Sequence, residues 1–360
     1  MPSEAAIRQA LNHGRYALIG AGQLGAMALA QWPARVARPE FILDSVKSGD
    51  LDGVEIRPLG GHVPDPGIIY LLSAFKMPPE GIRAIFDMVG QPDILTVYDL
   101  FEEFTPVAFT NGWRNVAPSE HVQDKLARLP GLFADDLSRH ICDCVTAWRY
   151  RRDLRDDYPV GPEEIKYNLA QFGRAGAHYD VIYDGGAYDL GLLAKLTKAN
   201  IGWDHVVAFE PDPASRSLCA PLPSKVVLDV RALGDRDGRG RFIANGLLSS
   251  RLIDDETLEH ADLIEVETCR LDDVHRALFG GADRRILVKL HVEGSEMAAV
   301  RGAANLLASD KVDLLINLSH DEPSWIDLPA LLASDGRHDL FLRSHALFGE
   351  GLTLFARHRD

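Results

Sequence analysis

The chain has 360 residues, a length that predicts two domains, and its 46% hydrophobic and 25% charged residues are typical of a globular protein. Its formal net charge of −15 opposes binding to nucleic acid, because such binding depends on Lys and Arg displacing counterions from phosphates. No apolar run approaches the roughly 18 residues that would cross a bilayer, so we expect neither a nucleic-acid partner nor a membrane.

The N-terminal segment and the cysteines indicate a cytoplasmic protein. Residues 1–16 lack a basic region followed by an apolar stretch, so no signal peptide is expected. The four cysteines are too few and too scattered for a disulfide framework. Cys142-x-Cys144 lacks the spacing of a zinc or redox site, and we interpret it as helix packing. A reducing compartment fits this pattern best.

The first 118 residues alternate strands with helices. A Pro-initiated helix is expected near Pro79–Met88. Short apolar runs predict strands at 16–20, 39–44, 67–72 and 93–98. Strands separated by helices imply a parallel sheet with helices on its faces, so residues 1–118 are predicted to form a Rossmann-like domain of the nucleotide-binding type.

A glycine fingerprint opens this domain. Gly20-x-Gly22-x-x-Gly25 follows the first strand and precedes a helix, and Asp44 lies about 20 residues further on, as in dinucleotide-binding units. Three uses remain open: NAD(P) binding by an oxidoreductase, binding of another nucleotide or nucleotide-sugar, and a structural or dimerising role. If the unit has a dimerising role, the protein is expected to form a homodimer.

Residues 119–174 show apolar residues at helical spacing and no strand signal, which predicts a helical connector. A second α/β domain is expected over 175–360. Its apolar runs predict further strands at 180–184, 205–210, 225–230, 285–292 and 312–320. Both domains are therefore predicted to be Rossmann-like units.

The first strand of the second domain ends in an acidic, glycine-rich turn. The turn comprises Asp184, Gly185, Gly186, Ala187, Tyr188 and Asp189. In an open parallel sheet, ligands bind beyond the carboxyl ends of the strands, where glycines let the backbone approach closely. Carboxylates at such a turn disfavour a phosphate and favour a cationic ligand, such as a sulfonium that carries an α-amino group.

The next strands also end in polar residues. Glu210, followed by Pro211, lies 26 residues after Asp184, where a strand-end acid accepts ribose hydroxyls. The simpler alternative for Glu210 is a charge at a helix N-terminus. Ala232, just after the third strand, is expected to border the adenine. All five strands direct their polar ends to one edge of the sheet.

These motifs resemble the FkbM family of S-adenosylmethionine-dependent methyltransferases. The family's D-x-G-A turn, its A-F-E-P motif and its K-x-x-V-E-G-x-E signature match residues 184–187, 208–211 and 289–296. A late block of one branch is echoed at 319–329, and that branch also carries an N-terminal glycine-rich unit. The resemblance covers most of residues 135–357.

The resemblance implies a class I methyltransferase-type parallel sheet with a terminal antiparallel strand. It also implies S-adenosylmethionine as cofactor, and methyl transfer to a hydroxyl of a sugar or another small hydroxylated metabolite. The cofactor-binding residues are then expected in the turn 184–188, at Glu210 and Pro211, and at Ala232.

Two positions depart from the family pattern. The last glycine of the turn falls on Leu190, with Gly191 one place late, and the signature aspartate falls on His291. Leu190 could crowd the methionine part of the cofactor. These departures support an alternative function, a catalytically silent protein that binds or acts as a scaffold.

An alcohol is a weak nucleophile, so a base is expected near the attacking oxygen. His291 and His320, both at strand ends, are the candidates, with Glu293 orienting the substrate or the base. A polar residue at a helix N-terminus is the alternative for His320. No ligand spacing predicts a metal, although a hard cation held by Asp184 or Glu293 remains open.

Overall fold

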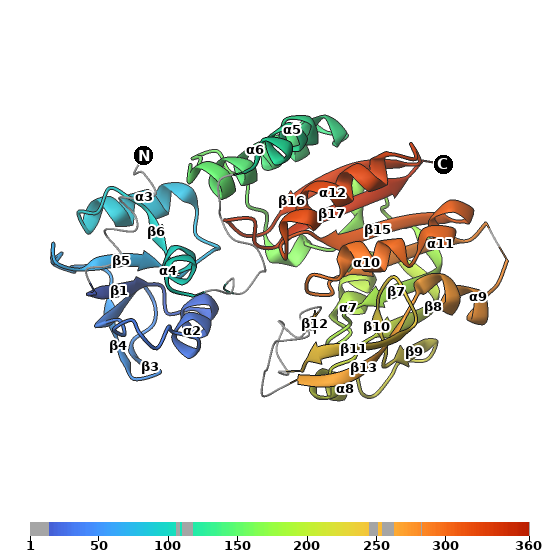
Figure 1. Ribbon diagram of the computed structural model, residues 1–360, viewed down its shortest axis with the longest axis horizontal. Coiled ribbons are helices and arrows are strands. Elements are labelled where there is room, and N and C mark those ends of the chain that lie inside the picture. The colour runs from blue at the N-terminus through green and yellow to red at the C-terminus, as the bar shows by residue number, and fades with distance from the viewer. Residues whose placement is uncertain are drawn as a thin grey trace. The chain divides into compact units, whose positions relative to one another are not determined.

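The computed structural model describes residues 14–105, 109, 118–244, 251–253, 263–281 and 283–359. Contacts divide the chain into two compact units (Figure 1). The first comprises Met1–Pro118, Cys144–Val160 and Ala346–Glu350, and the second comprises Ser119–Asp143, Gly161–His345 and Gly351–Asp360. Most of residues 1–16, where no signal peptide is expected, lies outside the described residues.

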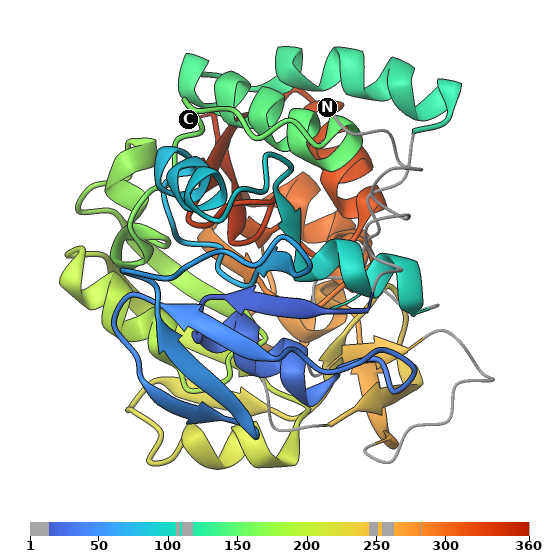
Figure 2. The same ribbon diagram turned by 90° about the vertical axis from the view of Figure 1, so that its left-hand side faces the viewer.

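The first unit contains a six-stranded sheet of order β3-β4-β2-β1-β5-β6, blue in Figure 2. All its described pairs are parallel except the β3–β4 hairpin. The strands are β1 (Tyr16–Ile19), β2 (Phe41–Asp44), β3 (Gly49–Leu51), β4 (Val54–Pro58), β5 (Ile69–Leu72) and β6 (Leu95–Thr96). The helices are α2 (Gln23–Ala30), α3 (Pro79–Met88) and α4 (Val97–Phe104).

Two local predictions for this unit need correction. The strand expected at 93–98 is only the two-residue β6, because Thr96 caps helix α4. The Thr96 hydroxyl accepts from the Asp99 backbone N–H, and the Asp99 carboxylate accepts from Thr96 N at 2.8 Å, which forms a capping box. The β3–β4 hairpin was not predicted.

Residues 119–174 contain helices rather than strands. They are α5 (Glu120–Arg128), η1 (Leu129–Leu132), α6 (Asp136–Arg151), η2 (Glu163–Ile165) and η3 (Leu169–Phe172). Helix α6 contributes to both units, which divide at Cys144. Cys142 and Cys144 are buried on α6, in keeping with a packing role. Among the described residues, no helix is both long and apolar enough to cross a membrane.

The second unit is built on a seven-stranded sheet of order β16-β17-β15-β14-β7-β8-β9. Every neighbouring pair is parallel except the two pairs made by β17, so the predicted α/β class with a terminal antiparallel strand is confirmed. The strands are β7 (His178–Gly185), β8 (Gly202–Phe209), β9 (Val226–Asp229), β14 (Arg285–Leu290), β15 (Lys311–Asn317), β16 (His338–Ser344) and β17 (Leu352–His358).

Between and after its strands, the described part of this unit forms the helices α7 (Gly191–Lys198), α8 (Pro213–Leu218), α9 (Leu271–Leu278), α10 (Glu296–Arg301), α11 (Ala304–Ser309) and α12 (Glu322–Ala333). Helix α11 packs on β15 and α12 packs on β16. The central strands β14 and β15 are almost entirely buried, as expected where helices cover both faces of a parallel sheet.

A second, four-stranded sheet in this unit was not predicted. Its order is β10-β13-β11-β12, and its strands are β10 (Ala232–Leu233), β11 (Gly238–Ile243), β12 (Arg251–Ile253) and β13 (Leu263–Cys269). Phe242 of β11 and Val266 of β13 are buried with Ala232 in a small apolar cluster. This sheet supplies part of the pocket described below.

Leu190, the first departure from the family pattern, is part of the hydrophobic core. It is the N-cap of α7, and it is 9% exposed in a cluster that includes Leu193 and Leu196. Its φ is +61°, in the left-handed region that favours glycine. The leucine side chain therefore stabilises the core, whereas the left-handed backbone conformation disfavours any residue with a β-carbon at this position.

We predict that at position 190 a glycine variant is more stable than an alanine variant, the reverse of the usual order inside a helix. Leu190→Ala and Leu190→Gly both lose a buried side chain, but glycine adopts the left-handed φ freely, so Leu190→Gly should be the more stable by about 1 kcal/mol. Chemical denaturation of the two variants measures this difference. At Leu193, inside α7, the usual order should hold, with alanine more stable than glycine by about 1 kcal/mol. The same order at both positions would contradict the prediction.

Candidate functional site

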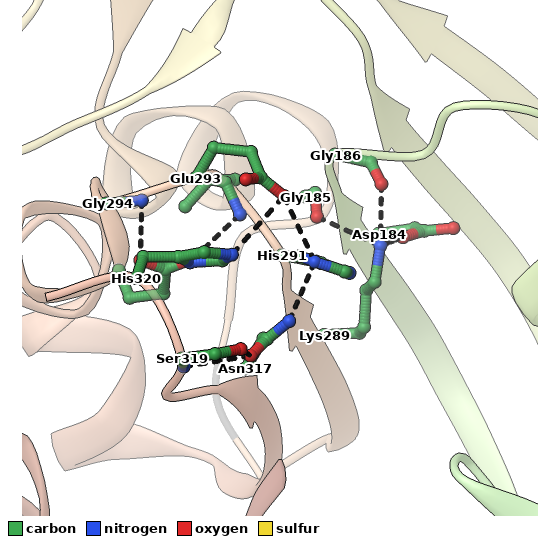
Figure 3. Close-up of polar contacts among 12 residues, drawn as sticks. Asp184, Gly185, Gly186, Lys289, His291, Glu293, Gly294, Asn317, Ser319 and His320 are labelled. Carbon is green, nitrogen blue, oxygen red and sulfur yellow. Dashed lines mark hydrogen bonds and ion pairs between the residues drawn. The ribbon is translucent and has the colours of Figure 1, made fainter. Parts of the chain in front are cut away.

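A buried ion pair joins the ends of the two central strands. Register places Asp184 of β7 opposite Lys289 of β14, and the Lys289 Nζ lies 2.8 Å from Asp184 Oδ1 (Figure 3). The same ammonium donates to the carbonyls of Gly185 at 3.1 Å and Gly186 at 2.6 Å. The carboxylate that we expected to face a cationic ligand is thus paired with a lysine of the neighbouring strand.

Asp184 depends on this lysine. The residue is fully buried, and apart from the Lys289 ammonium neither carboxylate oxygen has a hydrogen-bond partner among the described residues. Burial raises the pKa of Asp184, and the Lys289 ammonium opposes that increase. Asp184 is not among the residues that line the pocket described below. Its carboxylate therefore supports the pocket from within the protein and does not face a ligand.

The glycines of the turn allow two backbone segments to touch. Gly186 has φ +73°, and a β-carbon there would lie 2.0 Å from the His291 carbonyl oxygen. A β-carbon on Gly185 would lie 2.9 Å from Leu233 and 3.0 Å from Leu290. The turn after β7 therefore lies against the end of β14, and no larger residue fits at position 186 without displacing the backbone.

Glu210, directly after β8, is buried at the carboxyl edge of the sheet. Its Oε2 accepts from the Tyr188 backbone N–H and its Oε1 from the Asp212 N–H, both at 2.9 Å. Burial raises the pKa of Glu210, and these two backbone donors oppose the increase. Each oxygen keeps a further lone pair, so the carboxylate can still accept hydrogen bonds from a ligand.

A pocket opens at this edge, with about 650 Å³ of space that includes a part open to solvent. One end is apolar and includes Phe209, Ala232, Leu233, Phe242 and Leu252. The remaining lining residues are Gly186, Tyr188, Glu210, Pro211, Ser215, His291, Val292, Glu293 and Ser295. Ala187, although predicted for the cofactor site, belongs to the hydrophobic core.

At the polar end of the pocket, two histidines and a glutamate converge (Figure 3). Glu293 Oε1 lies 3.1 Å from His291 Nε2 and 3.3 Å from His320 Nε2. The two imidazole rings stack with centroids 5.3 Å apart. His291 and Glu293 line the pocket, whereas His320 is buried behind them and does not.

Neighbouring groups fix each member of this cluster. The His320 Nδ1 lies 2.8 Å from Glu296 Oε1, and Glu296 also accepts from the backbone N–H of Val292 and of Gly294, at 2.9 Å each. Asn317 Nδ2 lies 2.7 Å from His291 Nε2, and Tyr167 Oη lies 3.3 Å from His291 Nδ1.

Charges around the cluster set different pKa values for its members. Burial lowers the pKa of His291 to about 4, although Glu293 opposes this, so the imidazole is neutral at pH 7. Burial opposes the charged form of His320, but Glu293 and Glu296 raise its pKa well above the ordinary value. Burial would raise the pKa of Glu293, and the two imidazoles hold it well below its usual range.

His320 is not the N-cap of the helix that follows. Asp321 takes that position in α12 and accepts from the Ser324 backbone N–H. His320 therefore contributes to the cluster rather than to the helix terminus.

In the first unit, the glycine fingerprint is explained mainly by packing. A β-carbon on Gly25 would lie 2.5 Å from the Gly20 carbonyl oxygen, whereas one on Gly22 would meet nothing within 4 Å. The Asp44 carboxylate accepts from the backbone N–H groups of Ala21, Val46 and Lys47, at 2.8 Å each. Its carboxylate therefore serves to hold this turn, and the ligand of the unit stays a prediction.

Comparison with known proteins gives a family for this site. The FkbM methyltransferase domain matches residues 176–346. Residues 176–346 belong to the FkbM methyltransferase family. No curated protein matches the chain in sequence.

Among solved structures, an FkbM methyltransferase from Methylobacillus flagellatus KT aligns with a TM-score of 0.67 and 17% identity, over 99% of this chain and 94% of that one. At this identity the likeness shows the fold, and it extends over both units. A putative RNA methyltransferase from Pyrococcus horikoshii aligns at a TM-score of 0.26 with 8% identity, over 54% of this chain and 79% of that one. That similarity is too low to support an argument.

Several residues of the FkbM domain's site were not predicted. Lys289 and Glu296 stand in the signature run, but their partners depend on strand register and on a turn that sequence spacing does not give. Asn317 lies within the strand predicted at 312–320, but no role was predicted for its side-chain amide. Phe242 and Leu252 come from the unpredicted sheet, where the apolar run around Phe242 was the available signal.

We predict that the FkbM domain is destabilised by about 3–5 kcal/mol when Lys289 becomes Met, because the substitution leaves Asp184 buried without its partner. The double variant Asp184→Asn, Lys289→Met should recover most of this loss, and denaturant titration measures both. As a control, Lys311→Met breaks an exposed pair with Asp283 and should change stability by less than about 1 kcal/mol. The prediction would be contradicted if Lys289→Met lowered the free energy of unfolding by no more than Lys311→Met does.

Proposed function

We propose that the FkbM domain is an S-adenosylmethionine-dependent O-methyltransferase that acts on a hydroxyl of a sugar or another small hydroxylated metabolite. The observation that carries the proposal is Glu210, a buried carboxylate at the end of β8 that lines the pocket. It lies at the carboxyl edge of a parallel sheet, where such folds bind nucleosides.

The residues of the pocket fit the two ends of an adenosyl group. Glu210 keeps lone pairs for two ribose hydroxyls while backbone donors hold its carboxylate in place. The apolar end suits an adenine ring, with Ala232 and Leu233 after β9 and with Phe242 and Leu252 from the second sheet. Gly186 and Tyr188 line the wall where the amino-acid part would lie.

When bound, the cofactor supplies a methyl group on a sulfonium. This chain's residues must align the acceptor oxygen with that methyl group, and such positioning can contribute several kcal/mol. The polar end of the pocket, with His291, Glu293 and Ser295, suits an acceptor that carries hydroxyls. His291 and Glu293 face the pocket, so they are placed to contact the acceptor, and His320 would act through Glu293.

Leu190 no longer argues for a silent protein. It belongs to the core cluster and is not among the residues that line the pocket. His291 has hydrogen-bond partners at both ring nitrogens, Tyr167 and Asn317, and is therefore built into the site.

We predict that Glu210→Gln raises the Kd for S-adenosylhomocysteine by about 10- to 100-fold, because a hydrogen bond to a charged group contributes about 1.5–3 kcal/mol. Isothermal titration measures this effect. Asp229→Asn is a suitable control, since Asp229 ends the neighbouring strand β9, pairs with Arg231 and does not line this pocket. The Kd of the Asp229→Asn variant for S-adenosylhomocysteine should stay within about twofold of that of the unmodified protein. Equal affinities for the Glu210→Gln variant and the unmodified protein would contradict the ribose assignment.

The activity itself is tested by S-adenosylhomocysteine release with a panel of sugars and other polyols. Turnover with a hydroxylated acceptor is the expected result. Absence of cofactor binding at millimolar concentration would overturn the proposal. Binding without turnover on any acceptor would instead favour a silent, ligand-binding protein.

A further inference from the structure

Three metal-ligating atoms converge at the polar end of the pocket. His291 Nε2, His320 Nε2 and Glu293 Oε1 all lie within 4.8 Å of one another. Their residues come from the turn after β14 and from the segment after β15, so the sheet topology brings them together. We propose that these three side chains bind a divalent transition-metal cation.

The distances suit such a cation. Nitrogen and oxygen ligands lie about 2.0–2.2 Å from a zinc-like ion, which places neighbouring ligand atoms about 2.8–3.6 Å apart for ligand–metal–ligand angles of about 90–109°. Glu293 Oε1 is 3.1 Å from one Nε2 and 3.3 Å from the other. Two of the three ligand pairs therefore already have the required separation.

Hydrogen bonding leaves no proton between His291 Nε2 and Glu293 Oε1. The Asn317 Oδ1 accepts from the Ser319 backbone N–H at 3.0 Å, so its Nδ2 is the group that donates to His291 Nε2 at 2.7 Å. That nitrogen consequently presents a lone pair, and the Glu293 carboxylate faces it at 3.1 Å. Two acceptors at this distance repel unless a cation lies between them. A bound metal would take the place of the Asn317 donor.

The surrounding groups are those that orient metal-binding histidines. A histidine ligand usually donates its second ring nitrogen to a carboxylate or another acceptor, which fixes the direction of the first. Glu296 accepts from His320 Nδ1 in this way, and Tyr167 Oη lies 3.3 Å from His291 Nδ1. Both rings are held with Nε2 directed to the common centre (Figure 3).

Charge and ligand type indicate the class of cation. A metal can bind His320 Nε2 only after that nitrogen loses its proton. The ionised Glu293 and Glu296 then give the cluster a charge of −2, which a dication neutralises. The Lys289 ammonium is engaged by Asp184, and Lys166 is the nearby cation that opposes metal binding. Two imidazole nitrogens favour Zn²⁺, Co²⁺ or Ni²⁺ over Mg²⁺ and Ca²⁺, which prefer oxygen ligands.

The open side of the site faces the pocket. His291 and Glu293 line the pocket while His320 lies behind them, and three protein ligands leave a coordination position open. If the proposed methyl transfer holds, the acceptor hydroxyl would occupy this position. A cation there would orient the oxygen and lower the pKa of the hydroxyl. This part of the inference rests on the proposed function, whereas metal binding does not.

The experiment uses full-length protein stripped with a chelator and titrated with Co²⁺, followed by visible absorption, and with Zn²⁺, followed by calorimetry. We expect one tightly bound equivalent of either ion and no binding of Mg²⁺ at millimolar concentration. Glu293→Gln and His320→Gln should weaken Co²⁺ binding by about 100-fold or more, since each removes a ligand from the site. If His320→Gln does not fold, His291→Asn, at a more exposed position, provides the same test.

His178→Ala is the matched control, because His178 is an exposed histidine paired with Asp204 on the surface. It should bind Co²⁺ as the unmodified protein does. The proposal is overturned if the unmodified protein binds no stoichiometric Co²⁺ or Zn²⁺. It also fails if the cluster variants bind like the unmodified protein, or if His178→Ala abolishes binding.

Titration of the same metal-free protein with S-adenosylhomocysteine separates this proposal from the proposed function. Metal binding without binding of S-adenosylhomocysteine would support the metal site and count against the methyltransferase proposal. Binding of S-adenosylhomocysteine without metal binding would support the methyltransferase proposal and overturn the metal site.

Discussion

The site is organised by the ion pair between Asp184 and Lys289. A lysine within a buried parallel strand requires a partner, since an unpaired ammonium in the sheet interior is strongly unfavourable. Register supplies Asp184 directly opposite, and the remaining donors of Lys289 bind the carbonyls of Gly185 and Gly186. The turn after β7 is thereby drawn over the end of β14, where only glycine at 186 allows the two backbones to touch.

The two glutamates of the signature run then serve different purposes. Glu296 is fully buried and holds the turn after β14 together through two backbone N–H groups and His320. Glu293 has φ +52°, a left-handed conformation that disfavours a residue with a β-carbon. The turn that Glu296 stabilises maintains this conformation, and as a result the Glu293 carboxylate lies between the two imidazoles at the pocket.

The sequence supports accurate prediction of the parts of this protein that depend on local patterns. Apolar runs between helices indicate the parallel strands, and the glycines at 185 and 186 mark a turn of close approach. Register is not local, so the pairing of Asp184 with Lys289 could not be predicted. His291 and His320 are 29 residues apart in the chain, and only the adjacency of β14 and β15 brings them together. The four-stranded sheet was missed because charged residues interrupt its apolar runs.

His291 illustrates why a departure from a family pattern needs a structure to interpret it. An aspartate there would place a third carboxylate beside Glu293 and Glu296, with His320 to balance three negative charges. The imidazole removes one of those charges and provides a nitrogen lone pair, which Asn317 and Tyr167 orient. A position that had merely lost its function would not be expected to have partners for both ring nitrogens. The substitution therefore changes the chemistry of the site, from oxygen donors to a mixed nitrogen and oxygen set.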